Sequence, residues 1–205
     1  MPRKPAEPVR KAERSPGRPR KYAEGALVDA ALQVMEREGY AALTIRSLAQ
    51  ELGTSHSTLY NYVGHIEDIE NQAMQRLTAR LPMPQVSSAP ELRKQLMAYL
   101  LAVLRLLSQH PGVLFPPEGS AAWKTLYEIG EQWVRALAPY APDEKTTRLA
   151  LAALVAIVVV RAERDRVYGT PTRGRGRGQK VPLVFQTLEE ALDAMMNLVL
   201  PGLRR

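Results

Sequence analysis

The side chains with the greatest capacity for hydrogen bonding lie together in one short segment directly after Gly53 and Thr54. Residues 55–62 read Ser-His-Ser-Thr-Leu-Tyr-Asn-Tyr, and Leu59 is the one aliphatic member. Asn can bind adenine through two hydrogen bonds, and Ser or Thr can bind several bases or a phosphate. If a helix buries Leu59, its outward donors and acceptors are His56, Ser57, Thr58, Tyr60, Asn61 and Tyr62. The segment favours contact with the edges of DNA bases, and a polar face that meets only solvent is the alternative.

The elements that must position this segment are visible in the spacing of apolar residues. An apolar stripe at helical spacing predicts a first helix that Gly39 ends, and its members are Leu27, Ala30, Ala31, Val34 and Met35. Thr44 is a suitable N-cap for a short helix closed by Gly53, and Ser55 for a second short helix over 56–62. Two short helices joined by a tight glycine turn indicate a helix-turn-helix, whose second helix enters the major groove.

The remainder of the sequence is also predicted to be helical. Apolar stripes and Pro or Gly breaks indicate further helices over about 66–81, 92–107, 120–137, 143–168 and 185–200, and no stretch alternates as a strand would. The fold class is therefore all-α, with a three-helix DNA-binding unit and a larger helical body. We expect a disordered basic arm over 1–22, a helix-turn-helix domain over 23–69, and a ligand-binding and dimerisation domain over 70–205 that contains a flexible loop at 169–182.

Composition excludes several other classes of protein. The 205 residues contain no Cys and three scattered His, so disulfides, thiolate metal sites and a His cluster are not expected. No nucleophile elbow or phosphate-binding loop is present, so we expect neither an enzyme nor a cofactor. The longest apolar run, 149–160, is shorter than the roughly 20 residues that span a bilayer. A cytoplasmic protein with no membrane partner is expected.

The net charge of +7 is concentrated in two segments. Residues 1–22 hold eight cationic and two acidic side chains, and 169–180 hold four cationic side chains and no acid, whereas 23–66 carry a net charge of −3. Within the arm, Gly17-Arg18-Pro19-Arg20 resembles the core of an AT-hook, which places Arg in a narrow minor groove. The alternative for the arm is a solvating tail. The Arg-Gly tract at 173–178 is similar to nucleic-acid-binding tails, but a flexible loop is favoured.

Residues 43–69 (LTIRSLAQELGTSHSTLYNYVGHIEDI), with the helix before them, resemble the DNA-binding domain of the TetR family of bacterial transcriptional regulators. The Leu-Tyr-x-Tyr-Val form at 59–63 is similar to the tetracycline-repressor branch. The resemblance implies that Arg46 reaches a base or phosphate, that His56, Ser57, Thr58 and Asn61 lie near bases, and that Tyr60 and Tyr62 lie near phosphates. One departure is Ile66, which stands where the family usually has a phosphate-binding Lys.

The resemblance also implies a homodimer and a small-molecule pocket in the body. Residues 149–160 are apolar on all sides, so one side can meet the chain's own body and another a partner. Dimer candidates are Leu154, Val158, Leu188, Leu192 and Met195. Pocket candidates for an apolar ligand are Met97, Tyr99, His110, Phe115, Trp123, Tyr127 and Trp133. A buried helix in a monomer, and plain core for the aromatic residues, are the alternatives.

The function predicted from these features is a ligand-responsive transcriptional repressor. It would bind a palindromic double-stranded DNA operator as a homodimer and be released by a small apolar or amphipathic effector. A low-specificity, nucleoid-type DNA-binding protein driven by the basic arm is the alternative, and an activator is also compatible with the sequence.

Overall fold

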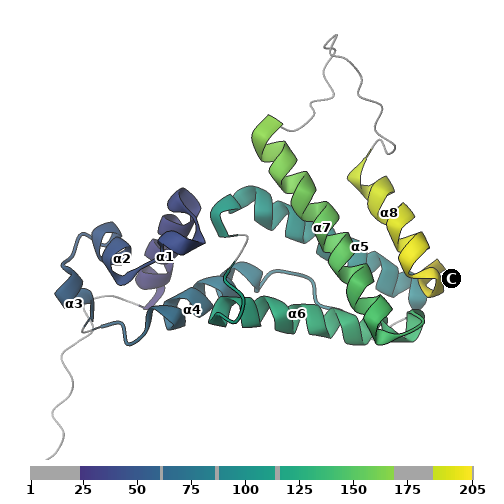
Figure 1. Ribbon diagram of the computed structural model, residues 1–205, viewed down its shortest axis with the longest axis horizontal. Coiled ribbons are helices and arrows are strands. Elements are labelled where there is room, and N and C mark those ends of the chain that lie inside the picture. Colours follow the sequence, from purple (N-terminus) through teal and green to yellow (C-terminus); the bar gives the residue numbers. More distant parts are fainter. Residues whose placement is uncertain (1–23, 61, 86–87, 114–115, 169–186, 205) are drawn as a thin grey trace, which may run out of the picture.

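The chain folds into α-helices, and the computed structural model describes residues 24–60, 62–85, 88–113, 116–168 and 187–204. This described part contains eight α-helices and no strand (Figure 1). They are α1 (Glu24–Glu38), α2 (Ile45–Glu51), α3 (His56–Tyr60), α4 (Ile66–Thr78), α5 (Ala89–Gln109), α6 (Ala121–Leu137), α7 (Glu144–Tyr168) and α8 (Leu188–Val199). The predicted all-α class is confirmed. Predictions for the arm at 1–22, for Asn61 and Phe115, and for the loop at 169–182 lie outside the described residues.

The first hydrophobic core joins α1, α2, α3 and α4. Every member of the apolar stripe predicted for α1 is buried, from Leu27 to Met35. Leu59 of α3 is fully buried in this core, and α4 contributes Ile69, Ala73 and Met74. Because α4 buries its apolar face here, its first turns belong by packing to the unit formed by α1, α2 and α3.

A second core is built from α5, α6, α7 and α8. Its members include Leu96 and Leu100 of α5, Trp133 of α6, Leu154 of α7 and Leu192 of α8. On the surface, Arg93 of α5 donates a hydrogen bond to the Asp193 carboxylate of α8 at 2.5 Å. Figure 1 shows α7 crossing α5, with α8 beside it at the end of the molecule far from α3.

The two cores are connected through α6, which contributes Ala122 to the first and Trp133 to the second, and through α4, which packs on α6. Helix α4 packs against α1 and along α6 (Figure 1). Arg76 of α4 forms an ion pair with Asp29 of α1 at 2.6 Å, and Thr125 of α6 donates a hydrogen bond to Asn71 of α4 at 2.7 Å. Tyr40 donates a hydrogen bond to Glu70 at 2.9 Å, and its burial is the main cause that raises the pKa of the Tyr40 phenol. These contacts fix the orientation of the DNA-binding unit on the body.

Candidate DNA-binding site

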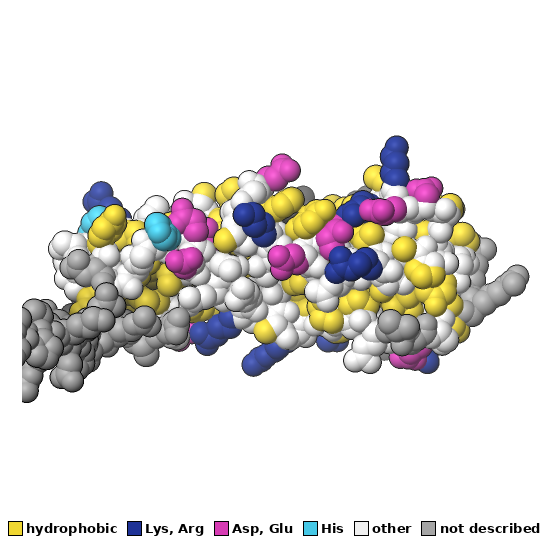
Figure 2. Space-filling model, turned by 90° about the horizontal axis from the view of Figure 1, so that it is seen from below, with side chains coloured by type: hydrophobic (Ala, Val, Ile, Leu, Met, Phe, Trp, Pro, Cys, Tyr) yellow, Lys and Arg dark blue, Asp and Glu magenta, His cyan; other side chains and the backbone are white. Residues whose placement is uncertain are grey.

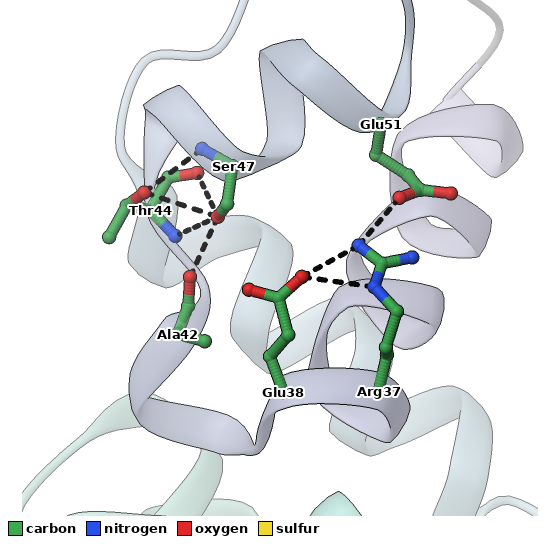
Figure 3. A network of polar contacts seen from close by, with 6 residues as sticks. All are labelled: Arg37, Glu38, Ala42, Thr44, Ser47 and Glu51. Carbon is green, nitrogen blue, oxygen red and sulfur yellow. Dashed lines mark hydrogen bonds and ion pairs between the residues drawn. The ribbon is translucent and has the colours of Figure 1, made fainter.

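Helix α2 begins at a reciprocal pair of hydrogen bonds. The Thr44 hydroxyl accepts from the Ser47 amide at 3.1 Å, and the Ser47 hydroxyl accepts from the Thr44 amide at 2.9 Å. The Ser47 hydroxyl also donates to the Ala42 carbonyl at 2.7 Å (Figure 3). This capping box satisfies backbone groups that an uncapped helix leaves without partners. It fixes the residue at which α2 starts, and with it the direction of the helix.

An ion pair connects the end of α1 to the end of α2. Figure 3 shows the Arg37 guanidinium between the carboxylates of Glu38 and Glu51, at 2.8 Å and 2.9 Å. The hydrogen bonds to these two carboxylates raise the pKa of Arg37, with Glu38 the larger cause. The charge of Arg37 is therefore paired with carboxylates inside the DNA-binding unit.

The turn between α2 and α3 depends on Gly53. Its φ of +61° lies in the left-handed region that glycine adopts without strain. The Thr54 amide donates to the Ala49 carbonyl at 2.9 Å and the Gly53 amide to the Gln50 carbonyl at 3.1 Å, which is the Schellman pattern. The chain therefore leaves α2 sharply and enters α3 after four residues, 52–55.

Helix α3 is held at its start by Ser55 and along its inner side by Leu59. The Ser55 hydroxyl accepts from the Thr58 amide at 3.1 Å, as the sequence predicted for an N-cap. The Ser55 and Thr58 hydroxyls also share a hydrogen bond of 2.7 Å. Thr58 is half-buried, so its side chain takes part in the cap as well as standing near the outer face.

Of the six predicted DNA-contacting residues that the structure describes, four are exposed on the outside of this unit. His56, Ser57 and Tyr60 are exposed, with Tyr60 66% accessible, and the rings of His56 and Tyr60 stack at 6.3 Å. Arg46 is exposed on α2, and Tyr62 is half-buried after α3. Asn61, Arg18 and Arg20 lie outside the described residues, so their positions stay predictions.

Ile66, the departure from the family pattern, packs partly against the first core. It begins α4 and is half-buried, so this position adds apolar contact in place of a cation.

Figure 2 shows acidic and basic side chains interspersed on the face of the molecule that it presents. In the sequence, residues 23–66 carry a net charge of −3. Phosphate attraction by the described DNA-binding unit therefore rests on few cations.

The predicted pocket residues do not come together in one place. Tyr99 and Trp133 are buried in the second core with ring centroids 5.0 Å apart, and burial raises the pKa of Tyr99 to about 12. Met97 packs partly against the same core. Trp123 and Tyr127 stack at 5.1 Å on α6, where Tyr127 is about half exposed. Phe115 lies outside the described residues.

His110 has a different environment from the other predicted pocket residues. It lines a cavity of about 650 Å³ between α1, α4 and α5, together with residues that sequence reasoning did not single out. These residues are Leu32, Arg76, Leu77, Ala79, Arg80, Leu81, Ala102, Arg105, Leu106 and Gln109.

The predicted dimer residues lie mostly inside the single chain, and their role in a dimer stays a prediction. Leu154, Val158 and Leu192 are fully buried inside the single chain, and Leu188 is nearly so. In the single chain, these side chains of α7 and α8 pack against α5 and against one another. Little of their surface therefore remains accessible to a partner. Met195 is half-buried and keeps part of its surface free.

Sequence reasoning missed the residues that do expose apolar surface on α7 and α8. Leu149, Ala152, Ala156 and Val160 are exposed and follow one another by three or four residues, which places them on one face of α7. Leu198 of α8 is 73% accessible. The spacing of the α7 set was available in the sequence, but a helix that is apolar all round does not reveal which face its own chain covers.

Comparison with known proteins agrees with this geometry. The family model described as "Bacterial regulatory proteins, tetR family" matches residues 27–69. An uncharacterised HTH-type transcriptional regulator of Mycobacterium tuberculosis is 44% identical over 59 residues, which are 29% of this chain and 27% of that protein. The match therefore spans about a quarter of the relative's length, and the rest of that protein's sequence is not covered by it.

Two solved structures share the fold across nearly the whole chain. ActR of Streptomyces coelicolor, solved in complex with actinorhodin, is 19% identical, has a TM-score of 0.56, and aligns over 90% of this chain and 99% of its own. BioQ, solved with its natural double-stranded DNA operator, is 17% identical, has a TM-score of 0.55, and aligns over 89% and 98%. At these identities the likeness concerns the fold.

Proposed function

We propose that this chain, a helix-turn-helix transcriptional regulator of the TetR family, represses transcription by binding a palindromic operator as a homodimer. A small molecule bound to the helical body would release it from the DNA. The observation that carries the proposal is helix α3, which is anchored inward by fully buried Leu59 and presents His56, Ser57 and Tyr60 outward. A recognition helix needs this division between an anchored face and a polar face.

Dimerisation is supported by the uncovered apolar faces of α7 and α8. Leu149 and Val160 are 61% and 68% accessible in the single chain. Exposed large apolar side chains aligned on one face indicate a protein interface more often than they indicate free surface. A two-fold dimer would present two copies of α3 to half-sites about one helical turn apart, which is why a palindromic operator is expected.

Regulation by a small molecule is supported by the cavity between α1, α4 and α5. Its volume of about 650 Å³ lies within the range of roughly 300–1,000 Å³ that is typical of ligand pockets. In fold, the chain is similar to ActR, which was solved with the small molecule actinorhodin, and to BioQ, which was solved with its operator. Both kinds of partner, DNA and effector, are therefore proposed for this chain.

Selection of bound fragments from randomised duplex DNA tests the DNA-binding proposal. We expect a palindromic consensus, and affinity for it about 10³-fold or more above that for random DNA at physiological salt. Ser57→Ala should lower affinity for the consensus more than for random DNA, whereas Arg135→Gln on the surface of α6 should change neither. Equal affinity for all sequences would instead favour the low-specificity, nucleoid-type function and overturn the repressor.

A further inference from the structure

We propose that the cavity between α1, α4 and α5 binds an amphipathic organic anion, whose charged group is held by Arg80 and Arg105. This inference rests on the proposed response to an effector, and it names the chemical class of the effector and the site at which it binds. The site differs from the pocket that the sequence suggested: among the candidates that the structure describes, His110 is the one that lines this cavity.

The walls of the cavity supply an apolar surface. Leu32 comes from α1, Leu77 and Leu81 from α4 and the residues after it, and Ala102 and Leu106 from α5. A ligand with an extended hydrocarbon or aromatic body would bury that body against these side chains, and removal of apolar area from water favours binding.

The charge of the cavity is of one sign. Its ionisable lining consists of Arg76, Arg80, Arg105 and His110, and no acidic side chain lines it in the described part of the chain. Arg76 is paired with Asp29 at 2.6 Å, and His110 contacts Glu36 of α1. The described residues provide no ion-pair partner for Arg80 or Arg105. Two guanidinium groups therefore remain for an anion, and guanidinium is well suited to carboxylate, sulfonate and phosphate groups.

The position of the cavity connects ligand binding to DNA binding. Leu32 and Leu77 pack against the first core, which also anchors α3, whereas Ala102 and Leu106 pack against the second core. A ligand between these side chains contacts the DNA-binding unit and the body at once. If the ligand prefers one arrangement of the two units, its binding changes the affinity for DNA. Bound DNA must then change the affinity for the ligand by the same factor.

Two fluorescent probes with similar ring systems test the class of ligand on the full chain. 1-Anilinonaphthalene-8-sulfonate carries an anionic group, and N-phenyl-1-naphthylamine is its neutral counterpart. We expect the sulfonate to bind more tightly, with an affinity that falls as salt is added, because ionic attraction to exposed cations is screened. Equal affinity for the two probes, with no salt dependence, would overturn the proposal.

Variants at the two free arginines locate the site. Arg80→Gln and Arg105→Gln should each weaken binding of the sulfonate by up to about fivefold and leave binding of the neutral probe unchanged, as expected for a partly exposed ion pair. Arg135→Gln is the matched control, since Arg135 is an exposed arginine of α6 outside the cavity. Ala102→Phe should fill the cavity and remove both probes. If that variant fails to fold, the arginine variants still decide, and unchanged sulfonate affinity in both of them would overturn the proposal.

Operator binding without a probe separates this inference from the proposed function. The double variant Arg80→Gln/Arg105→Gln should bind the selected operator as the unsubstituted chain does. Saturating sulfonate should weaken operator binding of the unsubstituted chain about fivefold or more, and that of the double variant much less. A chain that binds its operator but shows no difference between the probes would retain the proposed DNA-binding function and lose this ligand site.

Discussion

Thr58 combines two tasks at the start of the recognition helix. Its hydroxyl shares a 2.7 Å hydrogen bond with the Ser55 cap, and the side chain is half-buried. If Thr58 also contacts a base, as the sequence predicts, the cap and that contact depend on the same oxygen atom.

We expect Thr58→Ala to cost about 1–3 kcal/mol of binding free energy on the operator and little on random DNA, because a base contact is lost. Thr58→Ser keeps the hydroxyl and should retain most of the affinity. Fluorescence anisotropy with both DNAs is the measurement, and thermal melting shows how much of any loss comes from the weakened cap. Equal losses on operator and random DNA would remove Thr58 from base recognition.

Single residues also show where sequence reasoning succeeds and where it ends. Leu59 could be assigned to the inner face because it is the one aliphatic side chain between Ser55 and Tyr62, and it is fully buried. The hydrogen bond between Ser55 and Thr58 could not be assigned, since a hydroxyl at that position can turn toward solvent, the backbone or another hydroxyl. The choice depends on rotamers that the surrounding structure selects.

Among the elements, α2 is the one whose start is most fully determined by side chains. Thr44→Ala removes the hydroxyl that accepts from the Ser47 amide, and we expect it to lower the free energy of unfolding by about 1 kcal/mol. Thr44→Ser should restore most of that stability because serine caps equally well. Urea titrations of the two variants and the unsubstituted chain measure the difference, and an alanine variant of unchanged stability would show that the cap contributes nothing.

The contact between α6 and α7 should depend on pH. Arg148 of α7 is hydrogen-bonded to Glu131 of α6, and this contact lowers the pKa of the Glu131 carboxyl from its ordinary value of 4.5. A lowered pKa in the folded state means that the stabilisation is complete above the ordinary value and is lost as the pH falls through the lowered one. Melting temperatures between pH 6 and pH 3 should therefore fall less steeply for Glu131→Gln than for the unsubstituted chain. Parallel curves would show that the pair does not contribute.

The caps of several helices could be predicted, whereas the faces of α7 could not. Thr44, Ser55 and Ser120 each accept the backbone hydrogen bond expected of an N-cap, because capping depends on residues that are close in sequence. The face of α7 that the chain covers depends on α5 and α8, which are distant in sequence. Val158 and Val160 are chemically identical, yet the first is fully buried and the second is 68% accessible.

At the scale of the whole molecule, this contrast gives a test of the proposed homodimer. Val160→Glu should dissociate the dimer and leave the folded monomer intact, because it places a charge on an exposed apolar face. Val158→Glu should destabilise the fold itself, because it buries an unpaired charge in the second core. Sedimentation velocity and circular dichroism distinguish the two outcomes. A Val160→Glu variant that remains a dimer would exclude this face of α7 from the interface.

The cavity is a further property that belongs to the whole chain. Its lining joins Leu32, residues 76–81 and residues 102–110, which meet because α4 packs on α1 and His110, at the end of α5, contacts Glu36 of α1. Nothing in the local spacing of these residues predicts that they face a common space. Sequence reasoning favoured aromatic side chains as pocket candidates, but Tyr99 and Trp133 contribute to the core because large apolar surfaces are the ones that folding buries most readily.

The largest charge asymmetry of the molecule lies between residues 1–22, with eight cations against two acids, and residues 23–66, with a net charge of −3. Release of counterions from DNA phosphates dominates most DNA affinity and requires cations at the phosphates. Within the described DNA-binding unit, Arg37 is paired with Glu38 and Glu51, and Ile66 stands where the TetR family, which this segment resembles, usually has a lysine. We therefore expect the basic segment to supply much of the salt-dependent affinity.

Deletion of residues 1–21 tests this division of labour between the basic segment and the folded unit. If about four of the eight cations meet phosphates, the slope of log K against log salt should become shallower by roughly 3–4 units. The melting temperature should not change, because the segment has almost no apolar residues to contribute to either core. Arg18→Gln/Arg20→Gln is the finer variant, and it should reduce any preference for A/T-rich flanking DNA if these side chains enter a minor groove. An unchanged slope after the deletion would mean that backbone amides and Arg46 hold the phosphates without the segment, and that its eight cations serve only to keep it solvated.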